Sequence, residues 1–391
     1  MRAFTAVYWK EVRENLRDRR TLINALLTGP LLGPVMFIML MNVMVSRELD
    51  KADRPIDVPV IGAELAPNLI RALKGAGIDA APAVSDPEAA VRDQRADVVL
   101  RIAPTYAEAW GKGQAVQVEV IYDSSRRDAS TPVNRVRNVI EAYGKREGAM
   151  RLIARGLSPT TAWPVQVAER DQASSQSRAA LMFSFLPYFF VLTVFLGGMY
   201  LAIDLTAGER ERQSLEPLFV NPVARGTILA GKLAAICTFS LVSLLLSVAA
   251  FSTAPWFIPV DKLGIALDLG VHFGAQVLLL MSPLILLLAA LQSWVSAMAK
   301  SYREAQTYLS VLMVIPILPS ALLSVIPVRP ESWMYAVPLL GQNLAIVQLI
   351  RGDGVNAEQM GLMLAGGFAA AIIAVIGAAW MYRSERLAIS G

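Results

Sequence analysis

Long apolar stretches alternate with short charged segments along this chain. Six stretches hold no Lys, Arg, Asp or Glu, apart from Asp204 at the end of one. A bilayer core of about 30 Å needs roughly 20 apolar helical residues, and only helices or closed barrels satisfy every backbone polar group in lipid. The pattern therefore predicts six transmembrane helices, at residues 22–45, 179–204, 233–260, 269–299, 305–328 and 361–382.

A seventh charge-free stretch, residues 332–350, contains Pro338, Gly341 and several amide side chains. We expect it to be a re-entrant or interfacial segment. Basic residues near helix ends mark the cytoplasmic side. With six spans, one side collects most of them, which predicts that both termini and the 383–391 tail are cytoplasmic. These residues are Arg2, Lys10, Arg13, Arg17, Arg19, Arg20, Arg210, Arg212, Arg225, Lys232, Lys300, Arg303, Arg383 and Arg386.

Residues 1–21 precede the first span and carry apolar side chains at helical spacing. Phe4, Val7, Tyr8, Val12 and Leu16 recur with charged residues largely between them. This pattern is typical of an amphipathic helix that lies in the membrane interface on the cytoplasmic side. A short cytosolic helix packed against protein is the alternative.

Residues 46–178, between the first two spans, have the charge content of a soluble domain. Strand-like runs at 56–62, 97–102 and 117–122 alternate with helix-like runs at 67–75, 86–95 and 133–156. Such alternation indicates a sheet with helical cover. The expected fold class is an α-helical polytopic membrane protein with six transmembrane helices and a large α/β extracytoplasmic domain between the first and second.

Composition agrees with a membrane location. Of 391 residues, 55% are hydrophobic and 17% charged, whereas soluble domains carry about 25% charged residues. The net charge is +4, but the basic residues lie at the ends of apolar segments and form no patch with aromatic residues between them. We therefore expect no nucleic-acid partner. A single cysteine, Cys237, and a single histidine, His272, leave no disulfide framework and little metal or triad chemistry.

The segment between the second and third spans, residues 205–232, departs most from its apolar surroundings. Glu209, Arg210, Glu211 and Arg212 predict a short amphipathic helix, which Pro217 and Pro222 then interrupt. A charged helix on the cytoplasmic surface suits docking to a soluble partner. The alternative is that these charged residues form an anchor that only holds the loop to lipid headgroups.

This segment resembles the loop of type-2 ABC transporter permeases, and in particular their NatB-type, or sodium-exporter, branch. In that family a glutamate-rich helix precedes a Leu-Pro-Leu-like segment, a Pro-Val-Arg-like turn and a Gly-Lys pair. Many relatives have Gly-Thr where this chain has Gln213-Ser214. The outer residues 96–102, Pro104 and 116–123 also resemble the family pattern. The resemblance of the segment is carried by Glu209, Glu211, Gln213, Ser214, Leu215, Glu216, Pro217, Leu218, Pro222, Val223, Arg225, Gly231 and Lys232.

The resemblance implies the permease subunit of an ABC exporter in a bacterial inner membrane, and not an enzyme. It implies a homodimer moved by two copies of a separate ATPase subunit, which would bind ATP and Mg while this chain holds no cofactor. Sodium is the candidate solute. The segment would be the coupling helix, with its glutamates against the ATPase subunit and Arg225 and Lys232 fixing it to the membrane surface. The implied docking residues are Glu209, Arg210, Glu211, Arg212, Leu215, Glu216, Pro217, Pro222, Arg225 and Lys232.

Residues 226–232 fit most of a phosphate-binding P-loop, but we reject nucleotide binding there. Leu233 stands where a Ser or Thr must hold magnesium. The run also follows a proline turn and enters an apolar stretch, whereas a phosphate cradle needs a preceding strand.

The six spans contain neutral polar groups but no charge within them. Intramembrane charges usually mark ion paths, so their absence argues against a proton- or sodium-driven secondary transporter. Most Ser, Thr and Gln side chains here should form contacts between helices. A minority could line a pathway, and the candidates are Asn42, Ser243, Gln276, Gln292 and Ser296.

Two further classes of function remain as alternatives. An intramembrane hydrolase needs a nucleophile with a base, or metal ligands, within the spans, and the sequence offers little of either. A membrane-anchored receptor or assembly factor would use the α/β domain alone, for which six spans are more than an anchor needs.

Overall fold

The computed structural model describes residues 2–53, 55–126, 129–162, 170, 172, 174–214, 223–258, 269–326 and 328–383. The chain forms two compact units. We call residues 1–45 and 172–391 the helical unit and residues 46–171 the α/β unit.

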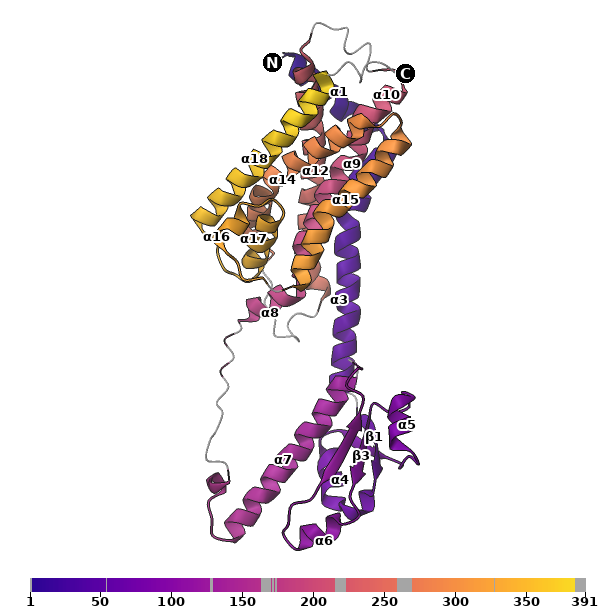
Figure 1. The fold of residues 1–391 in the computed structure, drawn as a ribbon, viewed down its shortest axis with the longest axis vertical. Helices are drawn as coiled ribbons and strands as arrows, with labels where there is room; N and C mark the ends of the chain where they lie inside the picture. Colours follow the sequence, from indigo (N-terminus) through magenta and orange to yellow (C-terminus); the bar gives the residue numbers. More distant parts are fainter. Residues whose placement is uncertain are drawn as a thin grey trace. The chain divides into compact units, whose positions relative to one another are not determined.

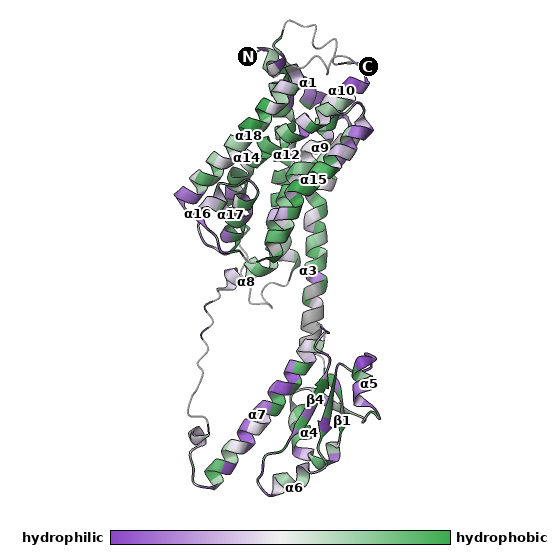
Figure 2. Ribbon diagram, viewed as in Figure 1, coloured by the Kyte–Doolittle hydropathy of each residue, from purple (hydrophilic) through white to green (hydrophobic). Residues whose placement is uncertain are grey.

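Six helices of the helical unit are long and apolar enough to cross a membrane. The apolar windows lie in Ile23–Val43, Leu186–Glu211, Arg225–Phe257, Val271–Met298, Tyr302–Leu323 and Ala357–Tyr382. Figure 2 shows that hydrophobic residues follow these helices, with hydrophilic residues near α1 and α10 at one end and near α16 at the other. The protein is thus mostly helical, as a polytopic membrane protein requires.

Figure 1 labels helices of this unit and colours them in the order in which they follow one another along the chain. The first half comprises α1 (Arg2–Arg17), α2 (Arg19–Leu22), the π-helix η1 (Ile23–Thr28), α3 (Gly29–Asp53), α8 (Ser175–Met182), α9 (Leu186–Ile203), the π-helix η5 (Asp204–Gly208) and α10 (Glu209–Glu211). The second half comprises α12 (Arg225–Ser252), α13 (Ala254–Phe257), α14 (Val271–Met298), α15 (Tyr302–Val325), α16 (Ser332–Tyr335), α17 (Leu340–Ile350) and α18 (Ala357–Arg383).

The segment at 332–350 holds two short helices. The longer, α17, has 11 residues. At 1.5 Å per residue it is about 16 Å long, too short for a bilayer core of about 30 Å. It packs beside α9 and α8. Gly366 of α18 permits close packing here, because a Cβ at that position would lie 2.0 Å from the Ala336 carbonyl oxygen.

Around residues 205–232 the helices extend beyond the predicted spans. Helices α9, η5 and α10 form one continuous helix that runs past Asp204 to Glu211. Helix α12 begins at Arg225, eight residues before Leu233, so Lys232 lies within it. Both helices can include these charged residues because Asp204 pairs with Arg212 and Lys232 pairs with Glu209.

Helix α9 is the centre of the helical unit. It packs against α12, α14 and α15, and residues Gly197 and Gly198 meet small polar residues of its neighbours. A Cβ at Gly197 would lie 2.7 Å from Ser243 Cβ and 3.2 Å from Ser240 Cα. These glycines therefore allow the backbones of α9 and α12 to approach closely, as small residues do between membrane helices.

The α/β unit contains a small four-stranded sheet in the order β2-β1-β3-β4. The strands are β1 (Ile56–Ile61), β2 (Ile78–Ala81), β3 (Val98–Ile102) and β4 (Val118–Tyr122). Strand β1 pairs in parallel with β2 and β3, and β4 is antiparallel to β3. The helices are the 3-10 helix η2 (Ala63–Leu65), α4 (Pro67–Gly75), α5 (Pro87–Arg92), α6 (Tyr106–Gly111), α7 (Ser130–Ala154) and the 3-10 helix η4 (Pro159–Thr161).

One hydrophobic core holds this unit together. Val58 and Leu100 of the sheet are fully buried with Leu69 and Leu73 of α4 and Val136 of α7. Strand β2 was not predicted, because its sequence Ile-Asp-Ala-Ala has one large apolar residue and weak strand propensity. Pairing with β1 determines its structure.

Candidate functional site

Three elements meet at one end of the helical unit. They are α1, the end of the second span at η5 and α10, and the first two turns of α12. Val12 of α1, Leu205 of η5, Leu229 of α12 and Tyr382 of α18 belong to one hydrophobic cluster. This cluster surrounds a set of buried charges, which is unusual in a chain whose spans are otherwise uncharged.

Lys232 of α12 and Glu209 of α10 form a buried ion pair. The Lys232 ammonium contacts a Glu209 carboxylate oxygen, with side-chain exposures of 1% and 6%. Lys232 Nζ also donates to the Leu205 carbonyl at 2.7 Å. That carbonyl belongs to η5, near the C-terminal end of the helix, where the helix dipole favours a cation. The pair therefore joins the end of the second span to the start of the third.

Helix α1 adds a second carboxylate and a second lysine to this set. Lys10 Nζ lies 3.4 Å from Glu209 Oε1 and 3.2 Å from Glu11 Oε1. Glu11 is 1% exposed, and Asn15 donates to its backbone oxygen at 3.0 Å. We call Lys10, Glu11, Glu209 and Lys232 the charge cluster. It connects α1 with both helices that flank the predicted coupling segment.

Burial makes the charged form of Glu11 costly. Desolvation raises the pKa of its carboxyl above the usual value of 4.5, although Lys232 and Lys10 act in the opposite direction and Glu209 raises it further. A protonated Glu11 would leave one carboxylate, Glu209, for the one fully buried ammonium, Lys232. With all four residues ionised the charge cluster holds two positive and two negative charges, so protonation of Glu11 would leave it with a net charge of +1.

Close packing of α1 on α12 depends on Gly231. A Cβ at this position would lie 2.8 Å from Val7 Cγ1 and 3.3 Å from the Phe4 carbonyl oxygen. About two turns further along α12, the Tyr8 hydroxyl is 3.1 Å from Thr238 Oγ1. The Gly-Lys pair thus has two physical roles: Gly231 admits α1, and Lys232 neutralises Glu209.

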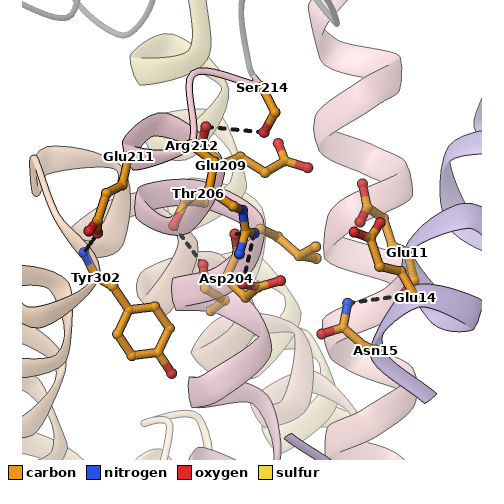
Figure 3. A network of polar contacts seen from close by, with 12 residues as sticks. Glu11, Glu14, Asn15, Asp204, Thr206, Glu209, Glu211, Arg212, Ser214 and Tyr302 are labelled. Carbon is orange, nitrogen blue, oxygen red and sulfur yellow. Dashed lines mark hydrogen bonds and ion pairs between the residues drawn. The ribbon is translucent and has the colours of Figure 1, made fainter. Parts of the chain in front are cut away.

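The residues after Glu209 form contacts nearer the surface (Figure 3). Glu211 accepts a hydrogen bond from the Tyr302 backbone N–H at 2.7 Å, at the start of α15. Arg212 pairs with Asp204 at 2.9 Å. Gln213 has φ of 55°, a left-handed conformation that glycine adopts without strain.

Two of the predicted docking residues are buried. Glu209 and Lys232 face each other inside the protein, so their side chains offer little surface, and a docking role for them stays a prediction. Arg210 donates to the Ala299 carbonyl at 3.3 Å, Glu211 and Arg212 are exposed, and Arg225 begins α12. The remaining predicted docking residues, Leu215, Glu216, Pro217 and Pro222, lie outside the described residues.

The rejected P-loop match at residues 226–232 is helical. These residues form the first turns of α12 after Ala224, and Lys232 is used internally. A phosphate cradle requires a glycine-rich loop with free backbone N–H groups. The helix provides no such loop.

The five predicted pathway residues do not come together. Ser243 donates to the Ala25 carbonyl at 2.6 Å, Ser296 accepts from Thr206 at 2.6 Å, and Gln292 Nε2 donates to the Phe195 carbonyl at 2.8 Å. These three are buried in helix contacts of α9, α12 and α14. Asn42 on α3 is exposed and Gln276 on α14 is half-buried. A pathway role for them stays a prediction.

Sequence reasoning missed Lys10 and Glu11. A signal was present: Glu11 lies three or four residues from Tyr8, Val7 and Asn15, on the face of α1 that carries the apolar residues. A carboxylate on such a face needs a buried cation. Its partner could not be identified without the tertiary contacts.

Two comparisons with known proteins show what this chain is similar to. Residues 25–376 match the family model described as ABC-2 family transporter protein. The chain is also 26% identical over 360 residues to the ABC transporter permease protein NatB of Bacillus subtilis (strain 168). That alignment covers 88% of this chain and 89% of the relative.

Proposed function

Because the chain belongs to the ABC-2 family of transporter proteins, we propose that it is the permease subunit of an exporter powered by a separate ATP-binding subunit. The observation that carries this proposal is the buried Glu209–Lys232 pair between the second and third spans. It ties together the two helix ends that flank residues 212–224, so that a force on this segment moves both spans.

The segment between α10 and α12 is the docking element in this proposal. Glu211 and Arg212 are exposed at its start. Glu209, in contrast, acts inside the protein and transmits movement to α12 and α1. ATP-driven approach of two ATPase subunits would press on this segment in each of two permease copies, and ATP and Mg would be bound by those subunits.

The topology that we propose puts α1 and the end of α18 in the cytoplasm and the α/β unit on the opposite side of the inner membrane. Support comes from the shared cluster of Val12 and Tyr382, which brings both ends of the chain to one end of the helical unit. Six spans between them then give an even number of crossings. The α/β unit, on an odd-numbered connection, would meet the solute after transport.

Sodium is the first solute to test, since the name of the Bacillus relative and the resemblance of the segment both point to that branch. The chain and a candidate ATPase subunit would be reconstituted in proteoliposomes, and ATP-dependent accumulation of radioactive sodium measured. We expect accumulation that requires both chains. Stimulation of ATP hydrolysis without sodium movement would support the permease class and exclude sodium. Absence of both sodium movement and stimulated ATP hydrolysis would overturn the proposal.

Docking is tested separately by co-purification of the ATPase subunit. Charge reversal of Arg212 together with Glu216 should release the subunit, while reversal of Arg92, an exposed residue of the α/β unit, should not. Glu209 is unsuitable for this test, since its reversal would disrupt the charge cluster. Undiminished co-purification of the Arg212→Glu/Glu216→Arg variant would remove the docking assignment.

A further inference from the structure

Helix α1 has two different long faces. Val7, Tyr8, Glu11 and Val12 pack against the helical unit, where Gly231 of α12 admits them. The opposite face carries Arg2, Ala6, Trp9 and Arg13, which follow one another at intervals of four, three and four residues. This spacing places them on one side of a helix.

The exposed face is basic and nearly flat. A shallow hollow of about 410 Å³ is lined by Arg2, Thr5, Ala6, Trp9 and Arg13. Trp9 is 55% exposed, an unusual state for such a large apolar side chain. Neither Arg2 nor Arg13 has an ion pair with any described residue. The acidic residues of α1 lie elsewhere: Glu11 is buried and Glu14 is beside Lys10.

Apolar exposure continues from this face toward the first span. Leu16 is 49% exposed, and Ile23 and Leu27 are 53% and 58% exposed. The window that begins at Ile23 is only 33% buried within the chain, so its remaining surface faces lipid or another protein. A Trp next to arginines, in a helix that precedes a span, is typical of the membrane–water interface.

We propose that this face is a binding site for the phosphate headgroup of an anionic phospholipid. Arg2 and Arg13 lie on either side of Trp9, 11 residues or about 16 Å apart along the helix, so each can donate hydrogen bonds to a phosphate at the same bilayer surface. Trp9 then lies at the level where headgroups meet acyl chains. Arg17, one turn beyond Arg13, extends the positive charge. The site requires only that the helical unit is inserted in a membrane, and not that the protein exports a solute.

Charge complementarity favours a lipid over a protein partner. Each basic residue near an anionic surface contributes a factor of about five in affinity. The apolar Leu16 and Trp9 would be costly to leave in water but contribute to binding at a lipid surface. A protein partner would have to provide acidic groups and an apolar edge along the same short helix.

The test is native mass spectrometry of the purified full-length chain, with phosphatidylglycerol and phosphatidylcholine added at equal concentration. We expect the wild-type chain to retain phosphatidylglycerol preferentially. In the Arg2→Gln/Arg13→Gln variant the preference should fall by about twenty-five-fold, the product of two such factors. A matched control, Arg92→Gln/Arg155→Gln, removes two exposed arginines from the α/β unit and should retain the preference.

Inorganic phosphate and glycerol 3-phosphate separate a lipid site from a free-anion site. At millimolar concentration they should leave the bound phosphatidylglycerol in place, because they lack the acyl chains that contact Trp9. Displacement by either would overturn the lipid assignment. An unchanged preference for phosphatidylglycerol in the Arg2→Gln/Arg13→Gln variant would also overturn it. If that variant kept the preference but no longer co-purified with the ATPase subunit, the face would bind a protein and not a lipid. Thermal unfolding of each variant confirms that it is folded.

Discussion

The Lys232 ammonium and the Glu209 carboxylate form an ion pair within the protein, with side-chain exposures of 1% and 6%. Taking two charges out of water costs several kcal/mol each, so such a pair persists only where hydrogen bonds support it. The Leu205 carbonyl provides one for Lys232, at 2.7 Å. The pair is therefore better understood as a specific connection between two spans than as a source of net stability.

Loss of either partner should be costly. The Lys232→Met variant leaves Glu209 buried with only the half-exposed Lys10 beside it, and we expect a destabilisation of about 3 kcal/mol. The double variant Lys232→Met/Glu209→Leu should recover most of this loss. Unfolding by sodium dodecyl sulfate in mixed micelles, followed by circular dichroism, measures these differences.

The control for that prediction is the surface pair of Arg212 with Asp204. Its side chains are 56% and 24% exposed, so Arg212→Met should change stability by less than about 1 kcal/mol. Equal effects of Lys232→Met and Arg212→Met would show that burial of the first pair has no energetic consequence.

Glu11 should make stability depend on pH. Burial raises its pKa in the folded protein above the usual 4.5, so the folded state holds the proton more tightly than the unfolded state. The resulting contribution to stability is fully present below pH 4.5 and is lost as pH rises through the folded pKa. Stability should therefore fall across this window, and Glu11→Gln should reduce the fall and be more stable at neutral pH.

Thermal unfolding of the detergent-purified protein from pH 4 to pH 8 measures this dependence. Glu14→Gln, on the same helix but with a side chain that is 60% exposed, is the matched control and should follow the wild-type curve. If the Glu11→Gln and wild-type curves were parallel over the whole range, Glu11 would not be the responsible group.

The contact of α9 with α12 should tolerate no added side chain at Gly197. A Cβ there would lie 2.7 Å from Ser243 Cβ, and the nearby Ser240 Cα belongs to backbone that cannot yield easily. We expect Gly197→Ala to cost about 1–3 kcal/mol. Gly226→Ala, within α12 where nothing lies within 4 Å of the new Cβ, should instead stabilise by up to about 1 kcal/mol. Mixed-micelle unfolding would reveal the opposite signs.

Much of the helical unit could be predicted because lipid imposes a simple rule on sequence. A helix that crosses a bilayer must be long and apolar, and six such stretches are visible without any structure. The same rule does not predict that one helix continues past Asp204 and that the next begins before Lys232. A charge marks a helix end only if it remains in water, and Lys232 is instead neutralised by a residue 23 positions earlier.

The charge cluster itself could not be derived from the sequence. Glu209 and Lys232 were identified through the resemblance, but as surface residues, since nothing local distinguishes a buried carboxylate from an exposed one. Lys10 and Glu11 come from a helix about 200 positions away from Glu209 along the chain.

In the α/β unit the stronger strands were predicted, and only β2, whose conformation depends on its neighbour β1, was missed.

A substitution at Gln292 can distinguish a packing role from a transport role for one of the predicted pathway residues. Its Nε2 donates to the Phe195 carbonyl, but its buried Oε1 has no hydrogen-bond partner among the described residues. An unsatisfied buried acceptor costs about 1–3 kcal/mol, which offsets the value of the bond that the same side chain forms. Gln292→Met, of similar length and with no such acceptor, should therefore change stability by less than about 1 kcal/mol in mixed-micelle unfolding.

Ser296→Ala, which deprives Thr206 of one hydrogen-bond acceptor, serves as the comparison. If Gln292→Met abolishes ATP-dependent solute accumulation while its stability is unchanged, the amide acts on the solute; if accumulation is retained, Gln292 is a packing residue and leaves the list of pathway candidates.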